Sequence, residues 1–136
     1  MNRYAEVLIE VPFHDTDAAG VVWHGWYAKY IEIARCALLE TFNFNYDEMA
    51  RTGYLWPVID LRLRYVKPAF FRQKIRVRAT LAEWEHRLKI DYLVTDERTG
   101  ERMTKGSTVQ VAVHAQSGEM CLVSPDILFE RLGLSR

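Results

Sequence analysis

The sequence predicts a single α+β domain in which an antiparallel five-stranded sheet wraps around one long central helix. One segment, residues 26–42, carries apolar side chains at helical spacing. Five other segments alternate apolar and polar residues, which is typical of strands with one buried face. Only one long helix is available to cover five apolar strand faces, so a sheet around that helix is the economical arrangement.

The first strand is expected at residues 4–11, where every second residue from Ala5 to Val11 is apolar and Pro12 ends the run. The other alternating runs follow the helix, at residues 59–65, 74–81, 88–94 and 109–113. Short connections at 83–87 and 96–100 favour antiparallel neighbours, and the second, Asp-Glu-Arg-Thr-Gly, has the composition of a hairpin turn.

The long helix is expected to be covered on most of its sides, because Ile33, Ala37 and Leu39 widen the apolar stripe formed by residues such as Tyr30 and Leu38. A shorter helix is expected at residues 46–52, with Asn45 as its N-cap and Gly53 just past its end. Residues 124–133 are expected to contain a short C-terminal helix that ends near Gly133.

Composition excludes several classes of protein. The 136 residues fit one domain, 1–136, and 49% of them are apolar, as in ordinary globular proteins. Lysine plus arginine equal aspartate plus glutamate at 18 each, so no overall charge favours nucleic acid. Cys36 and Cys121 have no CxxC partner, which indicates neither a disulfide framework nor a zinc site. We expect no membrane span, no signal peptide and therefore a cytoplasmic protein.

Self-association is also expected. A five-stranded open sheet leaves edge strands whose backbone groups a two-fold dimer could pair. The sequence therefore predicts a homodimer.

The most informative segment is residues 13–27, FHDTDAAGVVWHGWY. Two acids, Asp15 and Asp17, precede a small-residue turn, and His24 follows directly before the predicted helix. A carboxylate that faces the free N–H groups of a helix start can attack a carbonyl or direct a water, while the helix end receives the negative charge that develops on oxygen. The residues by themselves leave a second interpretation open, in which Asp17 is a turn acid and His24 a hydrogen-bonded structural residue.

The segment Asp15-Thr16-Asp17-Ala18-Ala19-Gly20-Val21-Val22-Trp23-His24 resembles the signature of the hotdog-fold thioesterases of the 4-hydroxybenzoyl-CoA thioesterase type, in particular the acyl-CoA thioesterases associated with the Tol-Pal system. Tyr27, Glu32 and Arg35 match positions further along the family's helix. The order and length of the elements fit over nearly the whole chain, and the specific part is residues 13–35.

The resemblance implies a hotdog dimer, often paired into a tetramer, that hydrolyses acyl-coenzyme A to a free acid and a thiol. We expect this hydrolysis to need neither a cofactor nor a metal. It assigns the catalytic carboxylate to Asp17 and a structural role to Asp15. It assigns the oxyanion donor to the backbone N–H of His24, whose side chain is a second catalytic candidate. Gly20 and Gly25 complete the loop.

For the substrate, the resemblance matches Arg87 and Lys89 to coenzyme A contacts, while Tyr27 and Trp26 are candidates for lining the acyl pocket. Two departures from the family pattern stand out: Trp26 replaces an Asn found in many relatives, and Ala19 stands where Gly is common. A bulky indole at position 26 could reshape the acyl pocket.

Other functions also fit the sequence. The same groove could bind acyl-CoA or acyl carrier protein without catalysis, and acyl carrier protein is a second candidate partner for an enzyme. Hydratase chemistry would need a histidine paired with an acid across the site, for which no segment matches. His14, His86 and His114 have no metal-ligand spacing, and no GxSxG or GxGxxG motif is present. Aryl and aliphatic acyl groups are equally compatible with the sequence.

Overall fold

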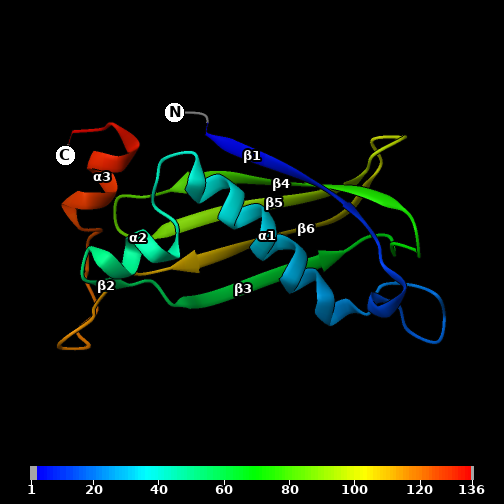
Figure 1. The fold of residues 1–136 in the computed structure, drawn as a ribbon, viewed down its shortest axis with the longest axis horizontal. Coiled ribbons are helices and arrows are strands. Elements are labelled where there is room, and N and C mark those ends of the chain that lie inside the picture. The colour runs from blue at the N-terminus through cyan, green and yellow to red at the C-terminus, as the bar shows by residue number, and fades with distance from the viewer. Residues whose placement is uncertain (1–2, 136) are drawn as a thin grey trace.

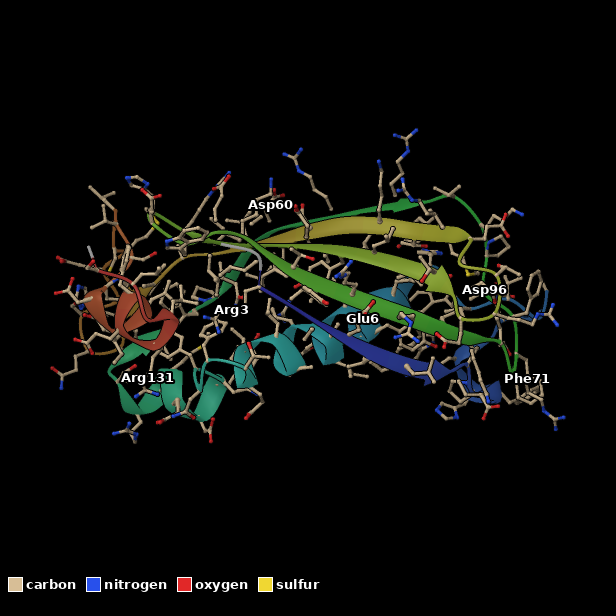
Figure 2. All side chains as sticks on the ribbon, turned by 90° about the horizontal axis from the view of Figure 1, so that it is seen from above. Arg3, Glu6, Asp60, Phe71, Asp96 and Arg131 are labelled. Carbon is tan, nitrogen blue, oxygen red and sulfur yellow. The ribbon has the colours of Figure 1, made fainter. Side chains whose placement is uncertain are left out.

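The long helix lies across one face of the sheet, so that the two form two layers (Figures 1 and 2). The computed structural model describes residues 3–135. Helix α1 spans Tyr27–Glu40, and the sheet has the strand order β1-β4-β5-β6-β3, with every neighbouring pair antiparallel. The strands are β1 (Tyr4–Glu10), β3 (Val58–Tyr65), β4 (Lys74–Glu83), β5 (Leu88–Asp96) and β6 (Arg102–Gln110). The predicted fold class is confirmed.

The core fills the space between α1 and the sheet. Tyr30, Ala34 and Leu38 on α1 are buried against inward-facing residues of the strands, such as Ile75 and Ile90. The prediction that most sides of the helix are covered is confirmed for most of its residues: of the 14 residues of α1, only Glu32, Ile33 and Glu40 are exposed. Ile33, which the sequence placed in the covered surface, is the exception at 45% exposure.

The last strand begins earlier in the chain than the sequence predicts. We expected residues 109–113, whereas β6 covers Arg102–Gln110 and pairs with β5 on one side and β3 on the other. Its inward positions hold Thr104, Gly106 and Thr108, so the strand has no alternating apolar signal. Gly106 has a steric reason, since a Cβ there would lie 2.2 Å from the backbone oxygen of Arg62 on β3.

The remaining elements close the end of the domain opposite residues 13–26 (Figure 1). Helix α2 spans Tyr46–Arg51, and the Asn45 side chain accepts a hydrogen bond from the Tyr46 N–H, as expected of an N-cap. Helix α3 spans Asp126–Leu132 and ends at Gly133, whose φ of 73° is left-handed. Two short strands that the sequence did not indicate, β2 (Tyr54–Leu55) and β7 (Val113–His114), pair with each other.

The two edges of the sheet differ. Strand β3 exposes large apolar side chains, with Ile59 at 58% and Leu61 at 47% exposure, although the alternation predicted that its apolar face would be buried. An edge strand far from the helix has little to cover it within one chain. On the other edge, β1 follows the expected half-buried pattern and packs against α1. Among residues 3–135, no helix is both long and apolar enough to cross a membrane.

Candidate active site

Asp15 holds the acidic loop, residues 13–20, to the start of α1. It ends the short 3-10 helix η1 (Phe13–Asp15), and its carboxylate has no exposed surface. The Nζ of Lys29 donates to both carboxylate oxygens, at 2.8 and 2.7 Å, and the Tyr30 hydroxyl donates at 2.6 Å. These contacts agree with the structural role that the sequence assigned to Asp15.

The contacts in this cluster shift the pKa values of Asp15 and Tyr30. Burial raises the pKa of Asp15, but hydrogen bonds from Lys29 and Tyr30 outweigh it and keep that pKa below its usual value. Burial and the neighbouring Asp15 carboxylate raise the pKa of Tyr30, so its hydroxyl stays a donor. The cluster is therefore an ion pair in neutral solution, and it fixes the loop rather than offering a free base.

Asp17, two residues later, sits in a tight turn with an exposed side chain. Its Oδ1 accepts from the Ala19 N–H at 2.8 Å, and its carbonyl accepts from the Gly20 N–H at 2.9 Å. Gly20 adopts φ +79°, a left-handed conformation that favours glycine. The turn thus holds one carboxylate oxygen of Asp17 and leaves the other accessible.

His24 begins the second 3-10 helix, η2 (His24–Trp26), which leads directly into α1. The first hydrogen bond of this helical segment is donated by the Trp26 N–H to the Trp23 carbonyl at 2.9 Å. The N–H groups of His24 and Gly25 precede it, at the positive end of the helix. The Trp23 indole folds over Gly25, and a Cβ at this position would lie 2.3 Å from the ring, so the indole would have to shift.

Asp17 and His24 line the same cavity, which has a volume of about 270 Å³. Its walls come from the acidic loop, the helix start and the chain that follows β3. The lining residues are Asp17, Val21, Val22, His24, Tyr27, Tyr65, Val66, Lys67 and Pro68. One carboxylate, one histidine and one lysine therefore share a mostly apolar pocket.

Sequence reasoning missed the wall that β3 and the following segment supply. The hydroxyl of Tyr65 donates to the His24 carbonyl at 3.0 Å, and its ring lies 5.2 Å from the Tyr27 ring, centroid to centroid. Lys67 forms an ion pair with Glu101 at 2.5 Å. In the sequence, Tyr65 was one member of an apolar alternation, and nothing local marked it or Lys67.

The predicted acyl-pocket residues divide in two. Tyr27 lines the cavity, and its buried hydroxyl accepts a hydrogen bond from the Ala69 N–H at 3.2 Å. Burial raises the pKa of Tyr27, which keeps it neutral. Trp26 does not line the cavity: its ring packs edge-on against Trp23, under the Lys29 ammonium, which lies 4.6 Å from the ring centroid.

The predicted coenzyme A residues lie elsewhere in this chain. β1 runs toward the acidic loop and β4 runs away from it, so the β4–β5 connection carrying Arg87 lies at the opposite end of the sheet (Figure 1). Arg87 there forms an ion pair with Glu83 at 2.7 Å. Lys89 stands on the sheet face away from α1, in register with Val109. Within one chain, neither residue reaches the cavity of Asp17.

The arrangement suits acyl transfer to water. A carboxylate held by a turn can activate or become a nucleophile, and N–H groups at a helix start can bind the developing oxyanion. The apolar wall gives space for an acyl group.

Comparison with known proteins gives consistent results. A model of the thioesterase-like superfamily matches residues 11–129. The solved DHNA-CoA thioesterase of Staphylococcus aureus is 30% identical, over 88% of this chain and 80% of that one, with a TM-score of 0.79. The chloroplastic acyl-acyl carrier protein thioesterase ATL3 of Arabidopsis thaliana is 30% identical over 82 residues, 60% of this chain and 43% of that protein. The 1,4-dihydroxy-2-naphthoyl-CoA thioesterase of Synechocystis shares the fold, with a TM-score of 0.84 at 17% identity, over 96% of both chains.

Proposed function

Because the chain belongs to the thioesterase-like superfamily, we propose that it hydrolyses acyl- or aroyl-coenzyme A to a free acid and coenzyme A, with Asp17 and the helix start at His24 as its catalytic groups. The observation that carries this proposal is that Asp17 and His24 line one cavity. Acyl carrier protein thioesters are the second substrate class, suggested by the name of the Arabidopsis relative.

In the proposed reaction, the thioester carbonyl oxygen lies against the N–H of His24, with the N–H of Gly25 beside it. The helix start stabilises the negative charge as the carbonyl becomes tetrahedral. The acyl group occupies the apolar wall formed by residues such as Tyr27 and Tyr65. The His24 side chain, also in the cavity, lies where it can contact the substrate.

Asp17 has two possible roles in this scheme. As a general base, its carboxylate takes a proton from water, which attacks the carbonyl carbon while the carbon–sulfur bond breaks and the thiolate leaves. As a nucleophile, the carboxylate attacks the carbonyl carbon, the carbon–sulfur bond breaks and the thiolate leaves, giving an acyl-enzyme anhydride that water then hydrolyses to the free acid and the Asp17 carboxylate. A rapid-quench experiment separates the two, because only the nucleophilic route allows a burst of thiol before an equal amount of free acid has formed.

A dimer through β3 fits the exposed apolar edge. Antiparallel pairing of β3 with its copy would place the Val58 end of one protomer beside the Tyr65 end of the other. Lys89 lies on the Val58 side of the sheet, since it pairs with Val109, which in turn pairs with Asp60. The dimer would thus bring Arg87 and Lys89 of one protomer toward the partner's Asp17, which is where a role in coenzyme A binding requires them.

The test is thiol release from a panel of acyl- and aroyl-coenzyme A thioesters, with wild type and Asp17→Asn side by side. The proposal expects hydrolysis by wild type and a loss of at least about 100-fold in kcat for the variant, which keeps its fold and its affinity. Release by neither protein, with binding of acyl-coenzyme A by both, would instead identify a binding module. Equal release by both would remove Asp17 from the mechanism.

A further inference from the structure

The face of the sheet away from α1 carries a basic hollow that the proposed chemistry does not use. We call it the outer-face hollow. It has a volume of about 510 Å³, and its charged lining residues are Arg62, Arg64, Arg102, Lys105 and Asp91. Figure 2 shows nitrogen-tipped side chains standing on the face of the sheet away from α1.

The strand register concentrates the positive charge. Arg64 on β3 lies directly opposite Lys105 on β6, and Arg62 lies opposite Ser107. Like charges that face each other across a ladder destabilise a sheet. Four cations and one acid, Asp91, line the hollow, although the whole sequence is balanced at 18 of each sign. The excess of positive charge is therefore a property of this hollow and not of the whole chain.

Most of these cations have no carboxylate partner among the described residues. Arg62 pairs with Asp60 at 3.1 Å. Arg64, Arg102 and Lys105 are exposed and take part in no ion pair within residues 3–135. Elsewhere on the same face, by contrast, Arg76 has Glu97 at 2.6 Å. The hollow thus presents free guanidinium and ammonium groups, which suit the oxygens of phosphates.

The hollow lies across β3 from the candidate active site. Neighbouring residues of a strand point to opposite faces, so Arg64 faces the hollow while Tyr65 lines the cavity of Asp17. The chain then continues through Val66 and Lys67, which also line that cavity. A ligand that passes the end of β3 would meet both places.

We infer that the outer-face hollow binds the phosphates of the 3′-phosphorylated adenosine diphosphate end of coenzyme A, whose pantetheine arm passes the end of β3 to reach Asp17. This inference rests on the proposed function and adds a residue set, Arg62, Arg64, Arg102 and Lys105, to the Arg87 and Lys89 that the sequence pointed to. Coenzyme A fits because it joins a polyanionic end to a thioester through a long flexible arm.

The test compares an acyl-coenzyme A with the same acyl group on pantetheine, which lacks the phosphates. The variant is Arg64→Gln/Lys105→Gln. The control, Lys74→Gln/Arg98→Gln, removes two exposed charges from outside the hollow. We expect the first variant to raise KM for acyl-coenzyme A by about tenfold or more, the equivalent of one lost charge-assisted hydrogen bond, and to leave KM for acyl-pantetheine unchanged. The control should behave as wild type for both substrates.

Other outcomes overturn the inference in distinguishable ways. If KM for acyl-coenzyme A is unchanged in the first variant, the hollow does not bind the phosphates, although the thioesterase proposal stands. An equal rise for both substrates, or the same rise in the control, would show an effect unrelated to phosphate. If wild type hydrolyses neither thioester, the proposed function fails, and calorimetry with 3′,5′-ADP decides the site alone: binding by wild type but not by the Arg64/Lys105 variant supports the hollow, and any other result rejects it.

Discussion

The Lys29 ammonium donates to both oxygens of the fully buried Asp15 carboxylate, at 2.8 and 2.7 Å, and so ties the acidic loop to the first turn of α1. Asp15 and Lys29 are 14 residues apart, and between them lie Asp17 and His24. The ion pair therefore closes the segment that carries the candidate catalytic groups. Its loss should alter that whole segment.

We expect Asp15→Asn to destabilise the fold by about 2 kcal/mol at pH 7, because a buried carboxylate that accepts from a cation is replaced by an amide with mismatched hydrogen bonds. Urea unfolding measures the change. The matched control is Asp17→Asn, whose side chain is exposed and whose effect should stay within about 0.5 kcal/mol. Equal stability of the two variants would contradict the anchoring role of Asp15.

The same group gives a pH dependence. The pKa of Asp15 is lower in the folded state than its usual 3.8, so the folded state binds fewer protons than the unfolded state in the range between the two pKa values. The stabilisation by Asp15 is present above pH 3.8 and is lost as pH falls through the lowered value. The stability difference between wild type and Asp15→Asn should therefore shrink below about pH 4 in acid unfolding series. A difference that persists unchanged to pH 2 would rule out this linkage.

Tyr65→Phe tests the positioning of the helix start. The substitution removes the hydroxyl that donates to the His24 carbonyl at 3.0 Å and leaves the ring contacts with Tyr27. One such hydrogen bond is worth about 1 kcal/mol, so kcat should fall roughly fivefold while the thermal midpoint moves little. Tyr4→Phe, at an exposed position on β1, is the control and should keep full activity. A change in KM alone would indicate that the Tyr65 hydroxyl serves substrate binding and not the positioning of the helix start.

Two glycines offer a matched pair. Gly20 and Gly100 both adopt left-handed φ angles, +79° and +75°, and a Cβ at either would meet nothing within 4 Å. Alanine at each should therefore cost a similar stability, about 1–2 kcal/mol. Only Gly20→Ala should lower kcat, because Gly20 closes the turn that holds Asp17. Chemical denaturation and steady-state kinetics on both variants check this, and equal activity of the two would separate the turn from catalysis.

The exposed edge of β3 predicts the oligomeric state. Wild type should be a dimer in analytical ultracentrifugation, and Leu61→Lys should shift it toward monomer, because the charge would be buried in the seam. Leu8→Lys, on the opposite edge strand with a similar exposure of 55% against 47%, should leave the dimer intact. Dissociation by Leu8→Lys instead would place the interface on β1.

Local patterns predicted the elements whose apolar residues recur. Helix α1 and strands β1, β4 and β5 all bury one regular stripe, so periodicity located them to within a few residues. It misplaced β6, whose inward positions hold Thr104, Gly106 and Thr108. Contacts with the neighbouring strands explain these residues. Gly106 leaves room for the backbone of β3, and the Thr108 hydroxyl forms a hydrogen bond with the Tyr92 hydroxyl at 2.7 Å.

In the candidate site, too, local sequence accounts for some features and the packing of the strands for others. The sequence by itself determined the acidic turn, its glycine and the helix that follows, because these features depend on residues adjacent in the chain. Only the tertiary structure decided that Lys29 neutralises Asp15, that Tyr65 and Lys67 close the cavity of Asp17, and that Arg64 and Lys105 face each other on the outer side. Strand register sets those contacts, and it depends on how all the strands pack around α1.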